Sequence, residues 1–203
     1  MLRTDDPPAA GLRERKKART RAAIQEHALR LFREQGYDET TVEQIADAAE
    51  VSPSTFFRYF PTKEDVVMYD ALDPVLIAAF RAQPPELSPI GAMRRAFHAV
   101  WDALPPEQLA AQHDRGQLVF SIPALRGAYM DDMIRTAREM AAILAERVGR
   151  DPGDFAVRTF TGALIGALLA AMLPAMEKSS ASAADYGELI DAALAHLEAG
   201  LPL

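Results

Sequence analysis

The segment that most constrains this chain is a short stretch with a proline near each end, residues 51–63, VSPSTFFRYFPTK. Ser52 is a good helix N-cap, and Pro53 would follow at the first helical position, where its missing N–H costs nothing. Pro61 disfavours a helical conformation at the residue before it, so this helix can extend only to about Phe60. The sequence therefore predicts a helix whose short length is set at both ends.

Two more helices are predicted ahead of it. The first spans about residues 13–35 and ends at Gly36, a residue suited to helix C-termini. The second begins with a capping box, in which Thr40 as N-cap and Glu43 satisfy each other's free backbone donors. A tight turn at residues 50–51 joins it to the short helix. These helices form a helix-turn-helix, which places its second helix in the DNA major groove.

The crowded aromatic residues of the short helix divide between two faces. Phe56 and Phe60 lie four residues apart, so they share a face that packs inward. Thr62 and Asp65 repeat the cap spacing and predict a fourth helix immediately afterwards. The polar side chains left on the outer face can reach base edges or phosphates: Ser54, Thr55, Arg58 and Tyr59.

The rest of the chain is also predicted to be helical. No period-two strand and no internal repeat is found, so the fold class is all-α, with about nine or ten helices. Residues 154–176 are apolar on nearly every side, which indicates burial against the chain's own core and against a partner. Gly162 and Gly166 permit close approach there. With the final striped helix, residues 186–197, this predicts a four-helix dimer interface; the alternative is a central helix in a monomer.

The net charge of −7 opposes nucleic-acid binding, but the charge is unevenly distributed. Residues 12–21 are strongly basic, and the remainder is acidic. A basic patch on an acidic body is compatible with DNA binding by one small region, although such a run can also be a solvated face. The chain has no cysteine, which excludes disulfides, thiolate zinc sites and a Cys nucleophile.

Features of other protein classes are lacking in the sequence. No signal peptide is predicted, and the most apolar run, residues 160–176, is shorter than the roughly 20 residues that a bilayer span needs and contains Pro174. We therefore predict a soluble, cytoplasmic protein without a membrane partner. The histidines are scattered, and no phosphate loop or nucleophile elbow occurs. No catalytic residue, metal ligand or cofactor is predicted; an enzyme or a helical small-molecule-binding protein without DNA binding is the alternative.

The stretch TTVEQIADAAEVSPSTFFRYFPTKEDVV closely resembles the DNA-binding domain of TetR-family transcriptional regulators. The resemblance covers about residues 13–67. It implies a three-helix helix-turn-helix domain (13–62) and a helical ligand-binding and dimerisation domain (63–203). The Asp, Pro and Gly residues ahead of them predict a disordered tail (1–12). The resemblance also implies a double-stranded DNA operator, a homodimer and a small-molecule inducer that releases a repressor from DNA.

The resemblance and the basic run together define the expected DNA contacts. Thr41, Tyr59 and Lys63 match positions that usually meet phosphates, and residues 52–55 match the start of the recognition helix. Phe57 stands where the family commonly has Tyr, so it packs on the sugar backbone, leaves one contact absent, or belongs to the core. The full set is as follows: Arg15, Lys16, Lys17, Arg19, Thr41, Ser52, Pro53, Ser54, Thr55, Phe57, Arg58, Tyr59 and Lys63.

Aromatic and methionine side chains beyond the first domain are the candidates for a ligand pocket, because such residues suit adaptable apolar surfaces. They are Met93, Phe97, Trp101, Phe120, Tyr129, Met130 and Met133. The chain also resembles a subgroup of the family whose ligands resemble acyl-CoA. This implies a long apolar ligand with an anionic head, which Arg94, Arg95, His98 or Arg126 could meet.

Overall fold

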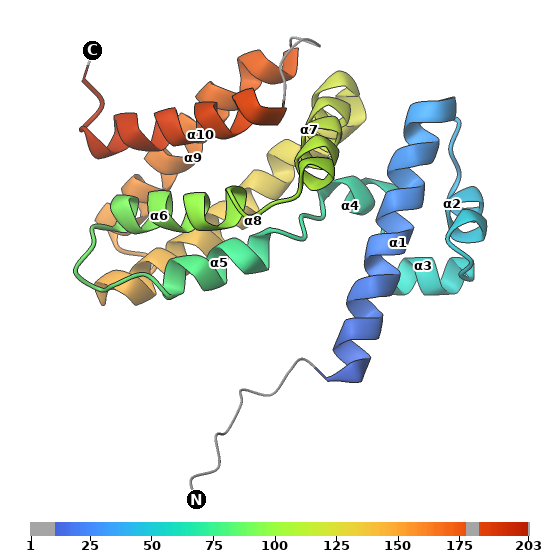
Figure 1. Cartoon of the computed structure of the whole chain (residues 1–203), viewed down its shortest axis with the longest axis horizontal. Coiled ribbons are helices and arrows are strands. Elements are labelled where there is room, and N and C mark those ends of the chain that lie inside the picture. Colours follow the sequence, from blue (N-terminus) through green and yellow to red (C-terminus); the bar gives the residue numbers. More distant parts are fainter. Residues whose placement is uncertain (1–10, 178–182, 203) are drawn as a thin grey trace, which may run out of the picture. The chain divides into compact units, whose positions relative to one another are not determined.

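The computed structural model describes residues 11–177 and 183–202, and every regular element within them is a helix (Figure 1). This confirms the all-α prediction. Residues 1–10 of the predicted tail lie outside the described residues, and α1 already begins at Leu12. The helices are α1 (Leu12–Gln35), α2 (Val42–Ala48), α3 (Pro53–Tyr59), α4 (Lys63–Met68), α5 (Asp73–Arg81), α6 (Pro89–Trp101), α7 (Pro106–Ser121), α8 (Pro123–Val148), α9 (Phe155–Glu177) and α10 (Ala183–Glu198).

The chain divides into two compact units, residues 1–69 and 70–203. The sequence analysis placed the boundary after residue 62, so α4 belongs to the first unit rather than to the second. The physical reason is a set of contacts between distant residues. Val66 and Val67 are fully buried, and the Gln25 side-chain amide of α1 donates to the carbonyls of Val66 (2.8 Å) and Tyr69 (2.7 Å).

The core of the first unit is built from one apolar stripe on each helix. α1 contributes Ile24, Ala28 and Phe32, all buried. Phe56 of α3 and Phe60 directly after it are also buried, with ring centroids 6.0 Å apart, which confirms that these two aromatics face inward. Gly36 ends α1 with a φ of 92°, a conformation that favours glycine. The predicted starts of α3 and α4 are likewise confirmed.

The capping box of α2 is shifted by one residue from the prediction. Thr41, not Thr40, is the N-cap: its hydroxyl accepts from the Gln44 N–H (3.2 Å), and the Gln44 side-chain oxygen accepts from the Thr41 N–H (2.9 Å). Thr40 is instead buried, and its hydroxyl donates to the carbonyl of Gly36 (2.7 Å). The sequence allows two capping boxes, Thr40 with Glu43 and Thr41 with Gln44. The tertiary structure selects the second, because Thr40 is buried.

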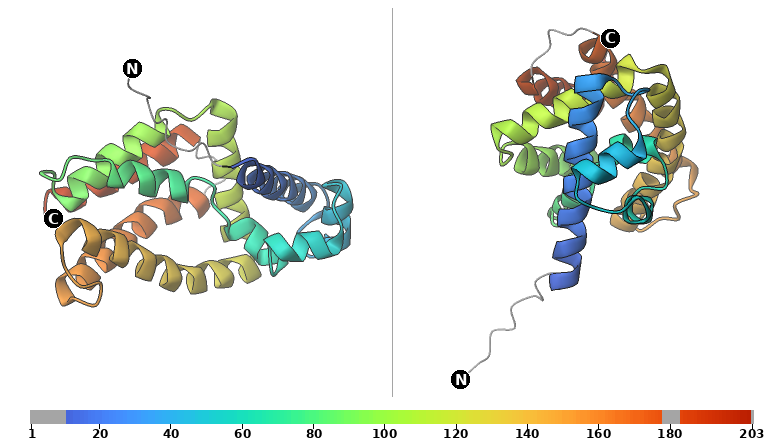
Figure 2. Two further views of the ribbon diagram at one scale, coloured as in Figure 1. Left: turned by 90° about the horizontal axis from the view of Figure 1, so that it is seen from below. Right: turned by 90° about the vertical axis from the view of Figure 1, so that its right-hand side faces the viewer.

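The second unit is a bundle of the six helices α5–α10 (Figure 2). α5 packs along α6, and α10 packs against both α6 and α9, while α8 packs against α7 and α9. Two buried clusters fill it. One surrounds Phe80 and Leu144, and the other joins Phe97, Leu164 and Leu194. The last two helices therefore lie against each other, as the interface prediction requires.

Over Phe155–Met172, α9 is long and apolar enough to cross a membrane by length and composition alone. The apolar run expected from Phe160 was too short for a span, whereas the helix begins at Phe155. A single such helix is weak evidence for a span, because interior helices of soluble proteins pass the same test. In this structure α9 packs against α7, α8 and α10.

Candidate DNA-binding surface and ligand site

The turn between α2 and α3 is set by backbone hydrogen bonds. The N–H of Val51 donates to the carbonyl of Ala46 (2.9 Å), and the N–H of Glu50 donates to that of Asp47 (3.0 Å). This pair of bonds is a Schellman motif, in which the chain leaves the helix through a left-handed residue. That residue is Glu50, with a φ of 54°. The motif turns the chain sharply enough for α3 to start at Pro53.

The start of α3 presents short polar groups in a defined arrangement. The Ser52 hydroxyl accepts from the N–H of Thr55 (3.1 Å) and lies 2.9 Å from the hydroxyls of both Ser54 and Thr55. Ser52, Pro53 and Ser54 are exposed, and Thr55 is half-buried. These residues form the accessible N-terminal end of the second helix of a helix-turn-helix, the part that meets base edges in that motif.

Further along α3, Phe57 and Arg58 are exposed and Tyr59 is half-buried. Phe57 is 51 % exposed, and its ring meets that of Phe56 edge-to-face at 5.5 Å. This exposure removes the core alternative for Phe57. An exposed aromatic ring beside polar groups is suited to packing on a sugar–phosphate backbone, and its contact with DNA stays a prediction.

The Lys63 side chain is half-buried, and its ammonium is hydrogen-bonded within the protein. Its ammonium donates to the carbonyls of Tyr37 (2.7 Å) and Thr40 (3.0 Å) and lies 4.0 Å from the centroid of the Tyr37 ring. The Tyr37 hydroxyl in turn donates to Glu64 (2.6 Å); burial, and then this bond, raise the pKa of Tyr37 well above its usual range. Lys63 thus stabilises the loop that ends in Thr41. Its phosphate contact, like that of exposed Thr41, stays a prediction.

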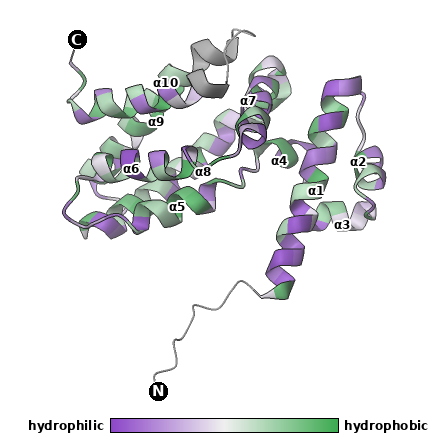
Figure 3. Ribbon diagram, viewed as in Figure 1, coloured by the Kyte–Doolittle hydropathy of each residue, from purple (hydrophilic) through white to green (hydrophobic). Residues whose placement is uncertain are grey.

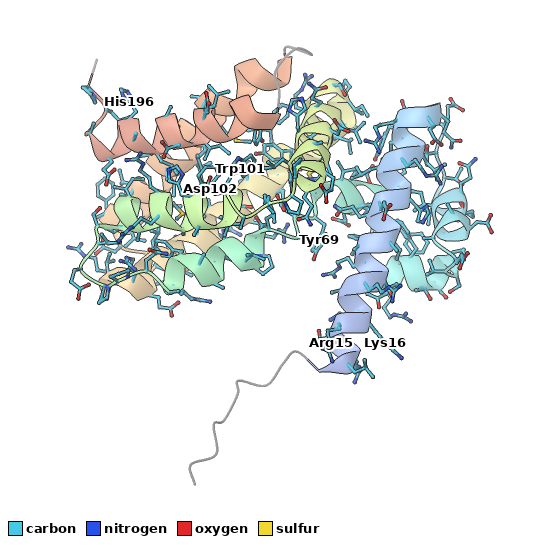
Figure 4. The ribbon with its side chains drawn as sticks, viewed as in Figure 1. Arg15, Lys16, Tyr69, Trp101, Asp102 and His196 are labelled. Carbon is cyan, nitrogen blue, oxygen red and sulfur yellow. The ribbon has the colours of Figure 1, made fainter. Side chains whose placement is uncertain are left out.

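The predicted basic arm forms the N-terminal part of α1, which is strongly hydrophilic (Figure 3). The four charged side chains assigned to DNA, Arg15, Lys16, Lys17 and Arg19, are all exposed. Arg15 and Lys16 project from the helix near its beginning (Figure 4). A helical arm holds these cations at fixed spacing along one rod.

The predicted ligand residues fall into two aromatic groups inside the second unit. Trp101 stacks on Phe97 of the same helix (5.2 Å) and on Tyr186 of α10 (6.1 Å). Phe120 of α7 meets Tyr129 of α8 edge-to-face at 5.2 Å. Of the methionines, Met93 packs against both buried clusters, Met133 is half-buried, and Met130 is 52 % exposed. Their ligand roles stay predictions.

A polar group lies beside these aromatics, and the sequence analysis did not find it. Arg115 of α7 pairs with Asp70, and the Gln112 side-chain amide donates to the same carboxylate (3.0 Å). Burial raises the pKa of nearby Asp73 to about 6, with the negative charge of Asp70 adding to the shift and Arg115 opposing it. Part of Asp73 is exposed, and solvent there weakens the effect. No local spacing signals this group, because Asp70 lies 42 residues from Gln112 and 45 residues from Arg115 in the sequence.

Tyr186 was likewise missed as a partner of the ligand residues. Burial raises the pKa of both Tyr129 and Tyr186, and the charge of Tyr129 adds to the shift of Tyr186. Tyr186 therefore belongs to the Trp101 stack and lies within electrostatic range of Tyr129. The apolar stripe of the last helix contained Tyr186, but a stripe alone does not distinguish a residue that faces a ligand from one that fills the core.

Two of the cations considered for an anionic head are already paired. Arg94 bonds Asp191 (3.0 Å) and Glu198 (2.7 Å), and hydrogen bonds to these carboxylates raise its pKa. His98 also contacts Asp191 (2.9 Å). Arg95 and Arg126 are exposed. Within residues 11–177 and 183–202, no group of three His, Asp or Glu side chains is placed to hold a metal ion.

A pocket of about 410 Å³ is lined by residues of α8, of α9 and of the segment between them. Its lining includes apolar Ile134, Ala137 and Gly162 and also Arg138 and Arg158. None of the predicted ligand residues contributes to its lining. The pocket and the aromatic groups are therefore separate features of the second unit.

The geometry of the first unit defines a class, the helix-turn-helix DNA-binding proteins. Comparison with known families narrows it: residues 24–68 match the model of bacterial regulatory proteins of the tetR family, and residues 87–202 match the model of the MftR C-terminal domain. The chain belongs to the TetR family and is a ligand-responsive transcriptional regulator, which confirms the resemblance stated from its sequence.

Individual relatives agree with this assignment. The chain is 39 % identical over 155 residues to the HTH-type transcriptional regulator TcmR of Streptomyces glaucescens, covering 73 % of this chain and 69 % of that one. It is similar in fold to a TetR-family regulator from Mesorhizobium loti (TM-score 0.55, 22 % identity, covering 91 % and 98 %). The repressor FadR of Thermus thermophilus, solved with lauroyl-CoA, is similar in fold as well (TM-score 0.55, 24 % identity, 90 % and 95 %).

Proposed function

We propose that this protein is a cytoplasmic, homodimeric repressor that a small apolar molecule releases from its operator. The observation that carries the proposal is α3, which is capped by Ser52 and presents Ser54, Phe57 and Arg58 to solvent. None of these three side chains contributes to the core, so they are available to DNA. Gel shift with the region upstream of the protein's own gene tests it. Binding there, with release by a ligand, is expected; binding no tighter than to a scrambled duplex would refute it.

The basic arm of α1 supports binding through charge. Each cation that neutralises a phosphate changes the slope of log affinity against log salt by about 0.9. Lys16→Gln with Lys17→Gln should weaken binding to all duplexes alike and flatten the slope by up to about 2. An unchanged slope would mean that the exposed arm is only solvated.

The dimer is proposed to form through α9 and α10. Only 17 % of the window Phe155–Met172 is buried within a single chain, although it is the most apolar helix. Gly162, Gly166 and Ala170 are exposed on α9, as are Ala192 on α10 and Ala199 directly after it. Small exposed residues along two neighbouring apolar helices permit the close packing of a four-helix interface.

Gly166→Glu tests this interface, because Gly166 is exposed in its own chain. A Cβ added at Gly166 meets no atom within 4 Å, so the single chain should accept the new side chain. In the dimer, however, the carboxylate would be buried without a partner. Sedimentation should show a dimeric wild type and a monomeric variant, with Gly166→Ala as the control. A wild-type monomer at micromolar concentration would exclude the dimer.

The ligand is proposed to contact the aromatic groups around Trp101 and Tyr129. Trp101 is the chain's single tryptophan, so its fluorescence reports on this site in the unmodified protein. Three probes would be compared: lauroyl-CoA, which has an acyl chain and an anionic head; free coenzyme A, which has the head alone; and an uncharged aromatic compound, which is apolar without that head. A true inducer should alter Trp101 emission. The inducer must also lower the protein's affinity for the operator. By linkage, the operator must lower the protein's affinity for the inducer by the same factor.

A further inference from the structure

Arg21 differs from the other basic residues at the start of α1. Arg15, Lys16, Lys17 and Arg19 are exposed, whereas Arg21 is half-buried. Its guanidinium carbon lies 4.8 Å from the ring centroid of Tyr69, 5.6 Å from that of Phe60 and 5.9 Å from that of Tyr59. These distances are within the range of cation–π attraction. The cation is therefore directed into the protein rather than toward DNA.

The groups around Arg21 mark the ends of two helices. Tyr59 is the last residue of α3, Phe60 is its C-cap, and Tyr69 is the C-cap of α4. An Nη of Arg21 donates to the Tyr59 carbonyl at 3.4 Å. That carbonyl is one of the acceptors that a helix leaves unpaired at its C-terminus, where a cation is also favoured by the helix dipole. One side chain of α1 thus contacts the ends of both α3 and α4.

Gln25, one turn after Arg21 on α1, contacts the same region. Its amide donates to the carbonyls of Val66 and Tyr69. The rings of Phe60 and Tyr69 also meet edge-to-face at 5.9 Å. Gln25 consequently holds the end of α4 on α1. Arg21 contacts the end of α3 as well, through the Tyr59 carbonyl.

We propose that Arg21 is a positioning residue for operator recognition, which fixes the C-terminal end of the recognition helix α3 against α1 and α4 and does not bind phosphate. The proposal rests on the proposed function, because α3 must be the helix that reads DNA. The recognition helix α3 has only seven residues, and Phe56 and Phe60 anchor its inner face in the core. The turn at Glu50 precedes its N-terminal end, and the Tyr59 carbonyl at its other end accepts from Arg21.

The same residues adjoin the junction of the two units. Tyr69 is the last residue of the first unit, and Asp70, the first residue of the second, pairs with Arg115 of α7. Each contact lies within one unit, and a single peptide bond joins Tyr69 to Asp70. Tyr69, a member of the aromatic cage of Arg21 (Tyr59, Phe60 and Tyr69), and Asp70, the partner of Arg115, are thus consecutive residues.

The test compares Arg21→Met with Arg19→Met in the full-length protein. The probes are a duplex that the wild type selects from a random library and a scrambled duplex of equal length, each titrated over a range of salt. Arg21→Met should lower affinity for the selected duplex about tenfold, with unchanged affinity for the scrambled duplex and an unchanged salt slope. Arg19→Met should weaken both and flatten the slope by about 1. A flattened slope with equal loss on both duplexes for Arg21→Met would overturn the proposal.

A double-mutant cycle with Tyr69→Leu separates positioning from a general loss of stability. All titrations are made below the melting transition of each variant. If the cage positions α3, the double variant should lose less affinity for the selected duplex than the sum of the losses from Arg21→Met and Tyr69→Leu alone. Tyr69→Phe, which keeps the ring, should retain wild-type affinity. Additive losses would overturn the proposal. A wild type that selects no duplex would instead refute the proposed function itself.

Discussion

Glu50 is expected to strain the turn of the helix-turn-helix, and replacing it with glycine should stabilise the protein. Glu50 has a φ of 54° and occupies the left-handed position of the Schellman motif after α2. In this conformation a Cβ approaches the following carbonyl oxygen, whereas glycine has no Cβ. The Glu50 side chain is exposed, so its removal leaves no cavity.

The size of the effect follows from two opposing contributions. A residue with a Cβ in the left-handed region costs about 1–2 kcal/mol. Glycine loses more backbone freedom on folding, which costs about 0.5–1 kcal/mol. The difference between these contributions is about 0–1.5 kcal/mol, so Glu50→Gly should stabilise the protein by up to about 1.5 kcal/mol, equivalent to a rise in Tm of up to about 6 °C for a chain of this length.

Urea unfolding and thermal melting of the full-length protein would measure the change, with Glu50→Ala as the control. Alanine removes the carboxylate but keeps the Cβ, so the difference between the two variants isolates the backbone contribution from any effect of charge. The urea midpoint should rise for glycine at an unchanged m value. If Glu50→Gly were no more stable than Glu50→Ala, the argument for strain at this turn would be wrong.

Three further outcomes are expected. Phe57→Tyr should preserve or tighten operator binding, while Phe57→Ala should weaken it without lowering Tm, because the ring is 51 % exposed; a marked fall in Tm would contradict this. Gly187→Ala should lower stability by about 1–3 kcal/mol and alter Trp101 fluorescence, because the added Cβ would overlap the indole; unchanged emission would contradict this. The raised pKa of Asp73 favours folding below about pH 4, a contribution lost as the pH rises through about 6. Asp73→Asn should therefore raise Tm at pH 7.5 more than at pH 4, and an equal rise at both would argue against the shift.

Helix boundaries in the first unit were predictable because they depend on neighbouring residues. Ser52 and Pro53 start α3 and Pro61 follows its end, while Thr62 and Asp65 form the capping box of α4. The exception is α2, where adjacent threonines offered two registers. The choice of Thr41 depends on Thr40 being buried against Gly36, a contact that no local rule contains.

The placement of charged and aromatic residues was less predictable. Arg21 continued the basic run of α1 in sequence, yet the structure places it against Tyr69 and the end of α3. Lys63 matched a phosphate-binding position, and the structure shows its ammonium bonded to backbone carbonyls. Spacing along a helix indicates which side chains share a face, but not which neighbouring element covers that face.

The sequence by itself determined the all-α class, the helix-turn-helix and the family, because capping, proline and apolar spacing act over a few residues. Only the tertiary structure decided that α4 belongs to the first unit, that Phe57 is exposed and that Tyr186 joins Trp101. The first and the third depend on hydrogen bonds and ring contacts between residues tens of positions apart, and the second depends on which face of α3 the core covers. Their free energy arises only once the helices have packed, so no short segment of the chain encodes them.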